Sequence, residues 1–177
     1  FQTITAPPEP QAYMPADAGA VIVWKNPRAT IDQLESLAAQ AGTAPPGAEP
    51  GWMRAMLTAE NPAMGEVDLT QPVWLSVMPQ SEAEAEADEQ PKMVLVLGVK
   101  GTAEQLTATL SEQTNVTRAG SLLVAVDKRL PASFAKPQKK RFAFPDHTAT
   151  LRDRSHITGH VRLDAYPELR KMLADSD

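Results

Sequence analysis

Residues 93–106 read Met-Val-Leu-Val-Leu-Gly-Val-Lys-Gly-Thr-Ala-Glu-Gln-Leu, and this segment contains two secondary-structure signals in succession. The apolar run over 93–99 has the length and the β-branched content of a buried strand. A Thr-Ala-Glu-Gln capping pattern at 102–105 follows it, and Leu106 and Leu110 then recur at helical spacing. The segment therefore predicts a strand followed directly by an amphipathic helix.

The same succession occurs earlier in the chain. Residues 20–24, Ala-Val-Ile-Val-Trp, predict a buried strand, and the apolar positions from Ile31 onward predict a helix of about three turns that Gly42 ends. The helix begins either with a capping box at Thr30 or earlier, at an Asn26 cap. We interpret the two strand-helix units as a pseudo-symmetric pair. The alternative is that both simply follow the general pattern of amphipathic helices.

Three further strands complete the predicted sheet. Residues 72–79 predict a strand with a proline at each end, and residues 115–118 and 122–126, joined around Gly120, predict either a hairpin or a bent pair of strands. The resulting order is strand, helix, strand, strand, helix, strand, which is the order of a split βαβ, or ferredoxin-like, fold. We therefore expect an α+β domain with one antiparallel sheet and both main helices on one face.

The second face of this sheet also needs a cover. Strands such as 122–126 are apolar at both alternating positions, whereas a sheet with one solvated face alternates apolar and polar residues. Two segments are candidates for the cover. One is a helical apolar stripe within 51–57, and the other is a C-terminal strand over 156–163 followed by a short helix whose stripe comprises Leu169, Met172 and Leu173.

The chain divides into four predicted parts. Residues 1–19 form a proline-rich tail, 20–130 the split βαβ core domain, 131–150 a basic, proline-rich linker, and 151–177 a C-terminal strand-helix unit. This last unit is either an addition to the sheet or the start of a second repeat. Because the chain opens at Phe1 with a proline-rich segment, we expect an exported mature protein, periplasmic or on the cell surface. The alternative is an artificial domain boundary.

The composition excludes several kinds of chemistry and partner. The 177 residues include no cysteine, which excludes disulfides, thiolate metal sites and cysteine nucleophiles. The formal net charge of −5 opposes general binding to nucleic acid. No apolar run approaches the roughly 18 residues that a bilayer span needs, so we expect no membrane span.

Two short segments are strongly charged. Residues 81–89 hold five acids and no base, and we expect an exposed acidic loop or a frayed helical turn there. Residues 136–141, Lys-Pro-Gln-Lys-Lys-Arg, hold four cations and precede two phenylalanines. We interpret this basic run as a linker that contacts the acidic loop. The alternative is a site that grips an anionic lipid or nucleic acid.

The histidines are the only candidates for metal binding or acid-base chemistry. His156 and His160 have the spacing of a helical metal pair, but their neighbours favour a strand, on which the two rings stand roughly 13 Å apart at ~3.3 Å per residue. Asp146 with His147, and Asp153 with His156, would form acid-base pairs. However, the sequence has no Gly-x-Ser-x-Gly nucleophile elbow and no phosphate-binding glycine loop. We therefore assign no catalytic, cofactor-binding or metal residue.

Several segments between residues 20 and 173 share a recurring pattern. They are Asp68-Leu-Thr-Gln-Pro-Val-Trp-Leu, the apolar strand ending in Gly98-Val-Lys, Arg118-Ala-Gly-Ser-Leu-Leu-Val-Ala-Val, and the strand that starts at His156. In these segments the chain resembles a group of uncharacterised exported bacterial proteins. The resemblance implies tandem strand-helix repeats outside the cytoplasm, with no established activity and no site residue.

These features favour a non-enzymatic, exported binding or structural module. We expect it to contact a protein partner, or a second copy of itself, through an apolar sheet face, and we expect no cofactor. One alternative is a small hydrolase or metal-dependent enzyme that uses His156, His160 and Asp153. A second alternative is a binder of anionic surfaces that uses the basic run 136–141.

Overall fold

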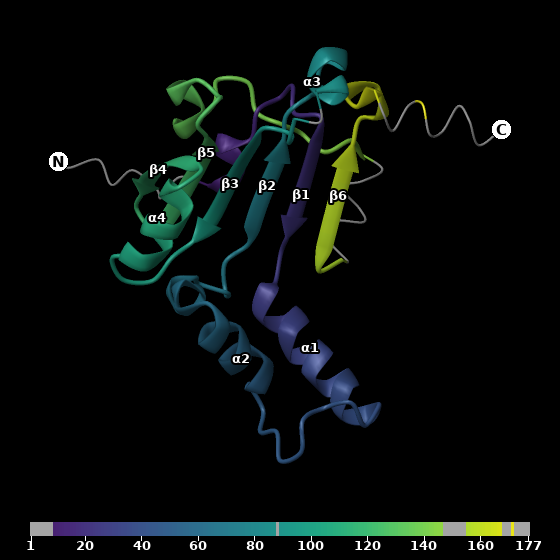
Figure 1. The fold of residues 1–177 in the computed structure, drawn as a ribbon, viewed down its shortest axis with the longest axis vertical. Helices are drawn as coiled ribbons and strands as arrows, with labels where there is room; N and C mark the ends of the chain where they lie inside the picture. The colour runs from purple at the N-terminus through teal and green to yellow at the C-terminus, as the bar shows by residue number, and fades with distance from the viewer. Residues whose placement is uncertain (1–8, 88, 147–154, 168–170, 172–177) are drawn as a thin grey trace.

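The computed structural model describes residues 9–87, 89–146, 155–167 and 171. Within them, six strands form one antiparallel sheet in the order β4-β5-β3-β2-β1-β6 (Figure 1). The strands are β1 Ala20–Trp24, β2 Val73–Val77, β3 Met93–Gly98, β4 Thr114–Ala119, β5 Leu122–Asp127 and β6 Ile157–Val161. The α-helices are α1 Pro27–Gln40, α2 Trp52–Glu60, α3 Glu82–Glu86 and α4 Glu104–Ser111, and the short 3-10 helices are η1 Pro10–Tyr13, η2 Pro62–Glu66, η3 Ala132–Ala135 and η4 Leu163–Ala165. The chain is α+β, as the sequence predicts.

The split βαβ arrangement predicted from the element order is not confirmed. β1 pairs with β2, β2 with β3, and β3 with β5, and each of these pairings is antiparallel. A βαβ unit requires its two strands to be parallel. Among strands that are consecutive in the chain and joined by a described α-helix, only β3 and β4 run in the same direction, with β5 between them and α4 connecting them, because both are antiparallel to β5. The two interlocked crossover units of the prediction are therefore absent from the described sheet.

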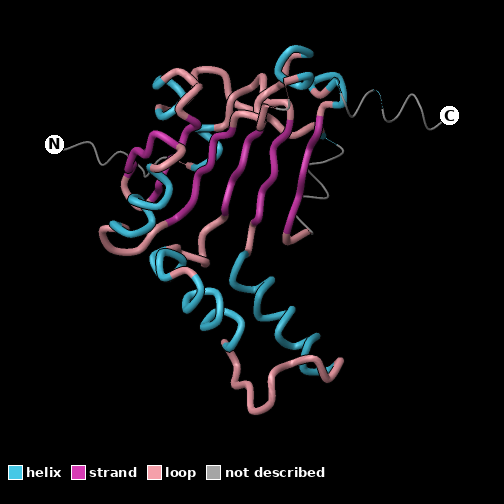
Figure 2. The backbone as a smooth tube through the Cα atoms, viewed as in Figure 1, coloured by secondary structure: helices cyan, strands magenta, loops and turns pink. Residues whose placement is uncertain are grey.

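The difference arises from the path of the chain after β1. A crossover helix must run back along the sheet before the next strand can be parallel. Instead, α1 begins at Pro27 and extends away from the sheet, and α2 returns beside it (Figures 1 and 2). β2 therefore starts at the end of the sheet where β1 stopped, and the two strands become antiparallel neighbours. We call α1, α2 and the loop between them the arm.

One face of the sheet, which we call the covered face, holds the larger core. It presents Val21 and Val23 of β1, Trp74 of β2 and the alternate valines of β3 and β5. Residues 10–19 and 130–144 cover it with little regular structure: Tyr13, Met14, Phe142 and Phe144 are buried, and the ring centroids of Trp74 and Phe144 lie 6.3 Å apart. Segments predicted as a tail and a linker therefore provide much of the core.

The opposite face, which we call the helix face, has a smaller core. α4 lies over the β4 end of the sheet (Figure 1), and it packs together with η2 against residues of β3 and β5. Leu106 of α4 and Ala63 of η2 are buried there against Leu97 and Leu123 of the sheet. A carboxylate takes the place of the predicted Thr102 capping box, since Glu66 Oε2 accepts a 2.7 Å hydrogen bond from the backbone nitrogen of Leu106.

Several local predictions are confirmed. β4 and β5 form the predicted hairpin, and Gly120 adopts the positive φ of 63° that its turn requires. The predicted C-terminal strand is present as β6 and pairs with β1, so it extends the same sheet. α1 begins after Asn26, the earlier of the two predicted starts, while the Thr30 hydroxyl bonds to the Asn26 carbonyl instead of forming a capping box.

The two segments predicted to cover the second face do not have that role among the described residues. α2 packs against α1 and η2, and none of its residues is buried. The predicted stripe of Leu169, Met172 and Leu173 lies outside the described residues. Instead, the irregular segments of 10–19 and 130–144 cover one face, because their aromatic and apolar side chains fill the space that a helix would otherwise occupy.

Candidate functional site

The helix face is also apolar across β6, β1, β2 and β3. The strand register places Val161, Ala20, Val77 and Met93 in one row from β6 to β3. A second row contains Gly159, Ile22, Leu75 and Leu95, and a third contains Ile157, Trp24 and Val73. Side chains in such rows contact each other across the strands and form a continuous surface. We call the patch formed by Ile22, Leu75, Val77, Met93, Ile157 and Val161 the open sheet face.

The open sheet face is more exposed than the rest of the sheet. Ile22, Met93, Ile157 and Val161 are 38, 45, 53 and 46% exposed, whereas Val21 and Val94 on the opposite side of the same strands are fully buried. In Figure 1, α4 lies over the β4 end of the sheet, and no described helix lies in front of β2, β1 and β6. Within the described part of the chain, the covered face of these strands is thus buried, whereas the open sheet face stays partly exposed.

The arm contributes the remaining large exposed apolar side chains among the described residues. These are Leu34 and Leu37 of α1 and Met56 of α2, each between 45 and 59% exposed. The apolar stripe predicted for α1 is therefore only partly used, because α1 contacts α2 and no sheet lies beneath it. Of the apolar stripe of α1, Ile31 is buried. Glu35, one helical turn further along α1, is buried as well.

A buried carboxylate fixes the geometry of the arm. Glu35 is 8% exposed, and its two oxygens accept hydrogen bonds of 2.8 Å from the backbone nitrogens of Gly51 and Met53. These are free donors at the first turn of α2, so Glu35 caps that helix from outside. The hydrogen bond from Gly51, followed by the one from Met53 and the nearby charge of Arg54, lowers the pKa of Glu35 below 4.5.

The same arm contains a cavity of about 370 Å³ between α1 and the start of α2. Its walls include Ala39, Ala48 and Trp52, with Glu35 and Arg54 on the polar side. Both charged groups are already engaged: Glu35 caps α2, and the Arg54 Nε atom lies 3.6 Å from Asp32 Oδ1. These contacts assign the polar groups of the cavity a structural role in holding α2 against α1.

The two described histidines lie in different environments. The Nδ1 atom of His156 lies 3.3 Å from the Thr30 hydroxyl at the start of α1. The ring of His160 lies on the covered face and packs against Phe142, with ring centroids 5.6 Å apart. Asp153 and His147 lie outside the described residues. Among the residues that are described, no group of three or more His, Asp or Glu side chains has a metal-binding arrangement.

The two charged segments are separate features of the structure. The acidic segment contains α3, whose Ser81 and Glu84 form a capping box, and Lys92 bonds to the Glu84 carboxylate. Glu89 lies 3.8 Å from Arg129. Glu84 and Glu89 of the acidic segment thus pair with Lys92 and Arg129, which lie outside the basic run 136–141.

No family model matches this chain, and neither a curated protein nor a solved structure is significantly similar to it. None of the described helices has both the length and the apolar character needed to cross a bilayer. The fold and the surface define an α+β protein whose antiparallel sheet is only partly covered by the described segments. Its function has to be inferred from its own residues.

The sequence indicated apolar sheet faces, but it did not indicate which strands stay uncovered. Alternation within one strand does not identify that choice, because β1 and β3 are apolar on both sides, and β2 is apolar except at Ser76. The capping roles of Glu35 and Glu66 were also missed. Each acts on a helix that starts far away in sequence, and a local capping pattern carries no signal of such a partner.

Proposed function

We propose that this chain is an exported, non-enzymatic binding module that docks a protein partner, or a second copy of itself, on the open sheet face. The observation that best supports the proposal is the set of three apolar rows across β6, β1, β2 and β3. Contiguous apolar patches on a soluble protein mark interaction sites, whereas single exposed apolar residues are ordinary.

The strands make this surface well suited to docking. The opposite faces of these strands are packed in the larger core. The exposed side chains are therefore held in fixed positions before a partner binds. A preorganised surface loses little conformational entropy on binding. Covering the exposed parts of Ile22, Met93 and Ile157 would contribute about 0.8 kcal/mol for each CH2 group removed from water.

Gly159 adds shape to this surface. It occupies the middle of β6, and a Cβ atom built there would lie 3.8 Å from the nearest side-chain atom of Ile22. The lack of a side chain therefore leaves a shallow dip beside a half-exposed isoleucine. An apolar side chain from a partner would contact both, which supports recognition by shape as well as by burial.

The proposal is tested by placing the photo-crosslinker p-benzoylphenylalanine at Ile22 and, as a matched control, at Thr109, which is exposed on α4. We expect a specific adduct at position 22 only, with purified protein if the partner is a second copy and with extract of the source cells if it is another protein. The double variant Met93→Lys and Val161→Lys should abolish the adduct. It should also retain the melting curve of the unmodified chain, because both side chains are already nearly half exposed.

Sedimentation velocity identifies the kind of partner, since self-association raises the sedimentation coefficient of the purified chain with concentration. Equal adduct yields at positions 22 and 109, in both the purified protein and the extract, would refute the proposal. Export is a separate part of the proposal, and fractionation of the source cells tests it directly.

A further inference from the structure

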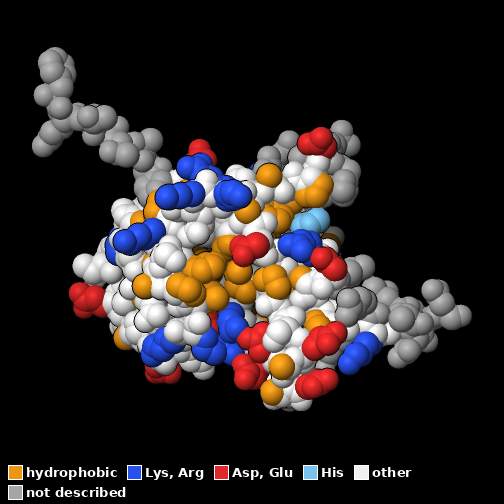
Figure 3. All heavy atoms as spheres, turned by 90° about the horizontal axis from the view of Figure 1, so that it is seen from above, with side chains coloured by type: hydrophobic (Ala, Val, Ile, Leu, Met, Phe, Trp, Pro, Cys, Tyr) orange, Lys and Arg blue, Asp and Glu red, His pale blue; other side chains and the backbone are white. Residues whose placement is uncertain are grey.

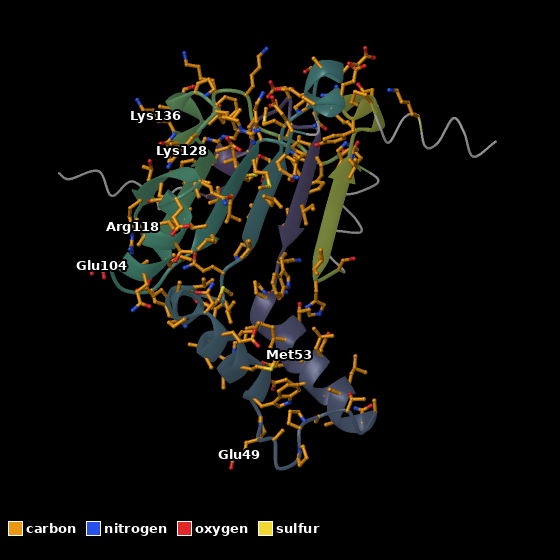
Figure 4. The ribbon with its side chains drawn as sticks, in the orientation of Figure 1. Glu49, Met53, Glu104, Arg118, Lys128 and Lys136 are labelled. Carbon is orange, nitrogen blue, oxygen red and sulfur yellow. The ribbon has the colours of Figure 1, made fainter. Side chains whose placement is uncertain are left out.

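A cleft of about 610 Å³ lies beside the covered face, between the N-terminal segment and the basic run. Lys136, Lys139 and Lys140 line it, together with Phe134, Pro137 and Asp17. Figure 4 places Lys136 at the end of the molecule opposite the tip of the arm, where Glu49 lies. The cleft is thus distinct from the open sheet face and from the arm.

The cations of the cleft are concentrated in one part of the chain. From Lys128 to Arg141 the sequence contains six cations and no acid, although the whole chain has a net charge of −5. Among the described residues, no ion pair involves Lys136, Lys139 or Lys140, and all three are exposed. Seen from above, Lys, Arg, Asp and Glu side chains all border a patch of hydrophobic side chains, and a row of Lys and Arg side chains lies along one edge of this view (Figure 3). Such a local excess of positive charge attracts anionic ligands.

The backbone of the basic run is fixed by hydrogen bonds to the N-terminal segment. The backbone nitrogen of Gln138 donates to the Ala12 carbonyl at 2.7 Å, and that of Phe142 donates to the Met14 carbonyl at 3.0 Å. The side-chain amide of Gln138 also donates to the Lys136 carbonyl at 2.7 Å. The three lysines therefore project from a fixed frame, which lowers the entropic cost of binding.

The lining favours one class of anion over others. Dedicated phosphate sites use clusters of free backbone N–H groups, but two of those in the basic wall of the cleft, at Lys136 and Gln138, are already bonded within the fold. A planar membrane does not fill a concave cleft, whereas an extended peptide does. Phe134 and Pro137 offer apolar contacts for the methylene groups of glutamate side chains, and the lysines pair with the carboxylates.

We propose that this lysine cleft binds an acidic peptide segment of a partner protein, one with several Glu or Asp residues in succession. Asp17 lies on the wall of the cleft and repels carboxylates, so acidic residues of the segment pair with the lysine side of the cleft. This inference is independent of the proposed docking on the open sheet face.

The test is fluorescence anisotropy with a fluorescein-labelled hexaglutamate peptide and the full chain. We expect saturable binding that weakens from 50 to 200 mM salt, because exposed charges are screened. The triple variant Lys136→Gln, Lys139→Gln and Lys140→Gln should lose at least about tenfold in affinity, since three exposed pairs are removed. A matched triple variant, Lys25→Gln, Lys100→Gln and Lys171→Gln, removes the same charge elsewhere and should retain affinity within about twofold.

Three outcomes would overturn the inference. One is equal loss of affinity in the two triple variants, which would indicate general electrostatic attraction. Another is the absence of saturable peptide binding at 50 mM salt. The third is tighter, cleft-dependent binding of tripolyphosphate, single-stranded DNA or phosphatidylglycerol vesicles than of the peptide. Peptide affinity should not change in the Met93→Lys and Val161→Lys double variant, which separates this test from that of the open sheet face.

Discussion

The backbone nitrogen of Gly51 donates a 2.8 Å hydrogen bond to Oε2 of Glu35, and this contact joins the two helices of the arm. The other Glu35 oxygen accepts from Met53, so one carboxylate caps the whole first turn of α2. α2 buries none of its own residues, and its position therefore depends strongly on this carboxylate.

Replacing Glu35 with Gln should lower the melting temperature by a few degrees at pH 7, because the amide accepts fewer hydrogen bonds and carries no charge. The folded pKa of Glu35 lies below 4.5, so its stabilising effect is full above pH 4.5 and is lost as the pH falls through the folded pKa. The difference between the two proteins should therefore shrink in acid. Glu49→Gln, which changes an exposed residue of the same arm, is the control and should not shift the melting temperature at either pH.

Replacing Phe144 with Ala should destabilise the fold by about 3–5 kcal/mol, the usual cost of removing a buried phenylalanine. Its ring packs against Trp74 and edge-on against Phe142, whose centroid lies 5.1 Å away. Phe134→Ala is the control and should cost less, because Phe134 is only partly buried. Urea unfolding measures both values. A change near zero for Phe144 would mean that residues 142–144 are not part of the core.

Two glycine substitutions should have opposite effects on stability. A Cβ atom at Gly159 would make only ordinary contacts, so Gly159→Ala should stabilise the fold by about 0.5–1 kcal/mol through lower chain entropy. A Cβ atom at Gly19 would lie 2.7 Å from the Tyr166 hydroxyl and 2.9 Å from the Ala165 Cβ atom, so Gly19→Ala should cost about 1–3 kcal/mol. Thermal and urea unfolding measure the stability of both variants. Equal effects would contradict the close approach of Tyr166 and Ala165 to Gly19.

The Glu84 carboxylate should titrate far below its usual range. Its hydrogen bond with Lys92, followed by those from Ser81, lowers the pKa of Glu84 to about 2. Lys92→Met should raise that pKa toward 4.5 without fully restoring it, since the Ser81 contacts remain. Carbon-detected NMR titration measures the change, with Lys100→Met as the control. An unchanged Glu84 pKa in the Lys92 variant would disprove the assigned cause.

Most individual strands could be predicted because their signals are local. The run 93–98, the hairpin around Gly120 and the strand at 157–161 each combine apolar content with clear turn residues, and all three are present. The signal for the start of α1, the Asn26 cap, is equally local. Such signals depend only on neighbours in sequence, so they hold whatever the tertiary arrangement is.

The order of the strands and the open sheet face could not be predicted in this way. The order strand-helix-strand is the same for a crossover helix as for an arm that leaves the sheet and returns, and only the direction of α1 separates them. The lysine cleft has a similar origin: the basic run was recognised, but its cleft exists because Gln138 and Phe142 bond to the N-terminal segment.

The sequence by itself determined the α+β composition, the sites of most strands, the absence of cysteine chemistry and the two charged segments. Tertiary structure alone decided that β1 and β2 are antiparallel neighbours, that segments 10–19 and 130–144 complete the core, and that the open sheet face stays partly exposed among the described residues. The physical reason is that burial is a property of contacts between distant segments. Val21 and Ile22 are both apolar and adjacent in the chain, yet the first is fully buried and the second is not, because the described segments that pack against β1 cover the side of Val21 and leave Ile22 partly exposed.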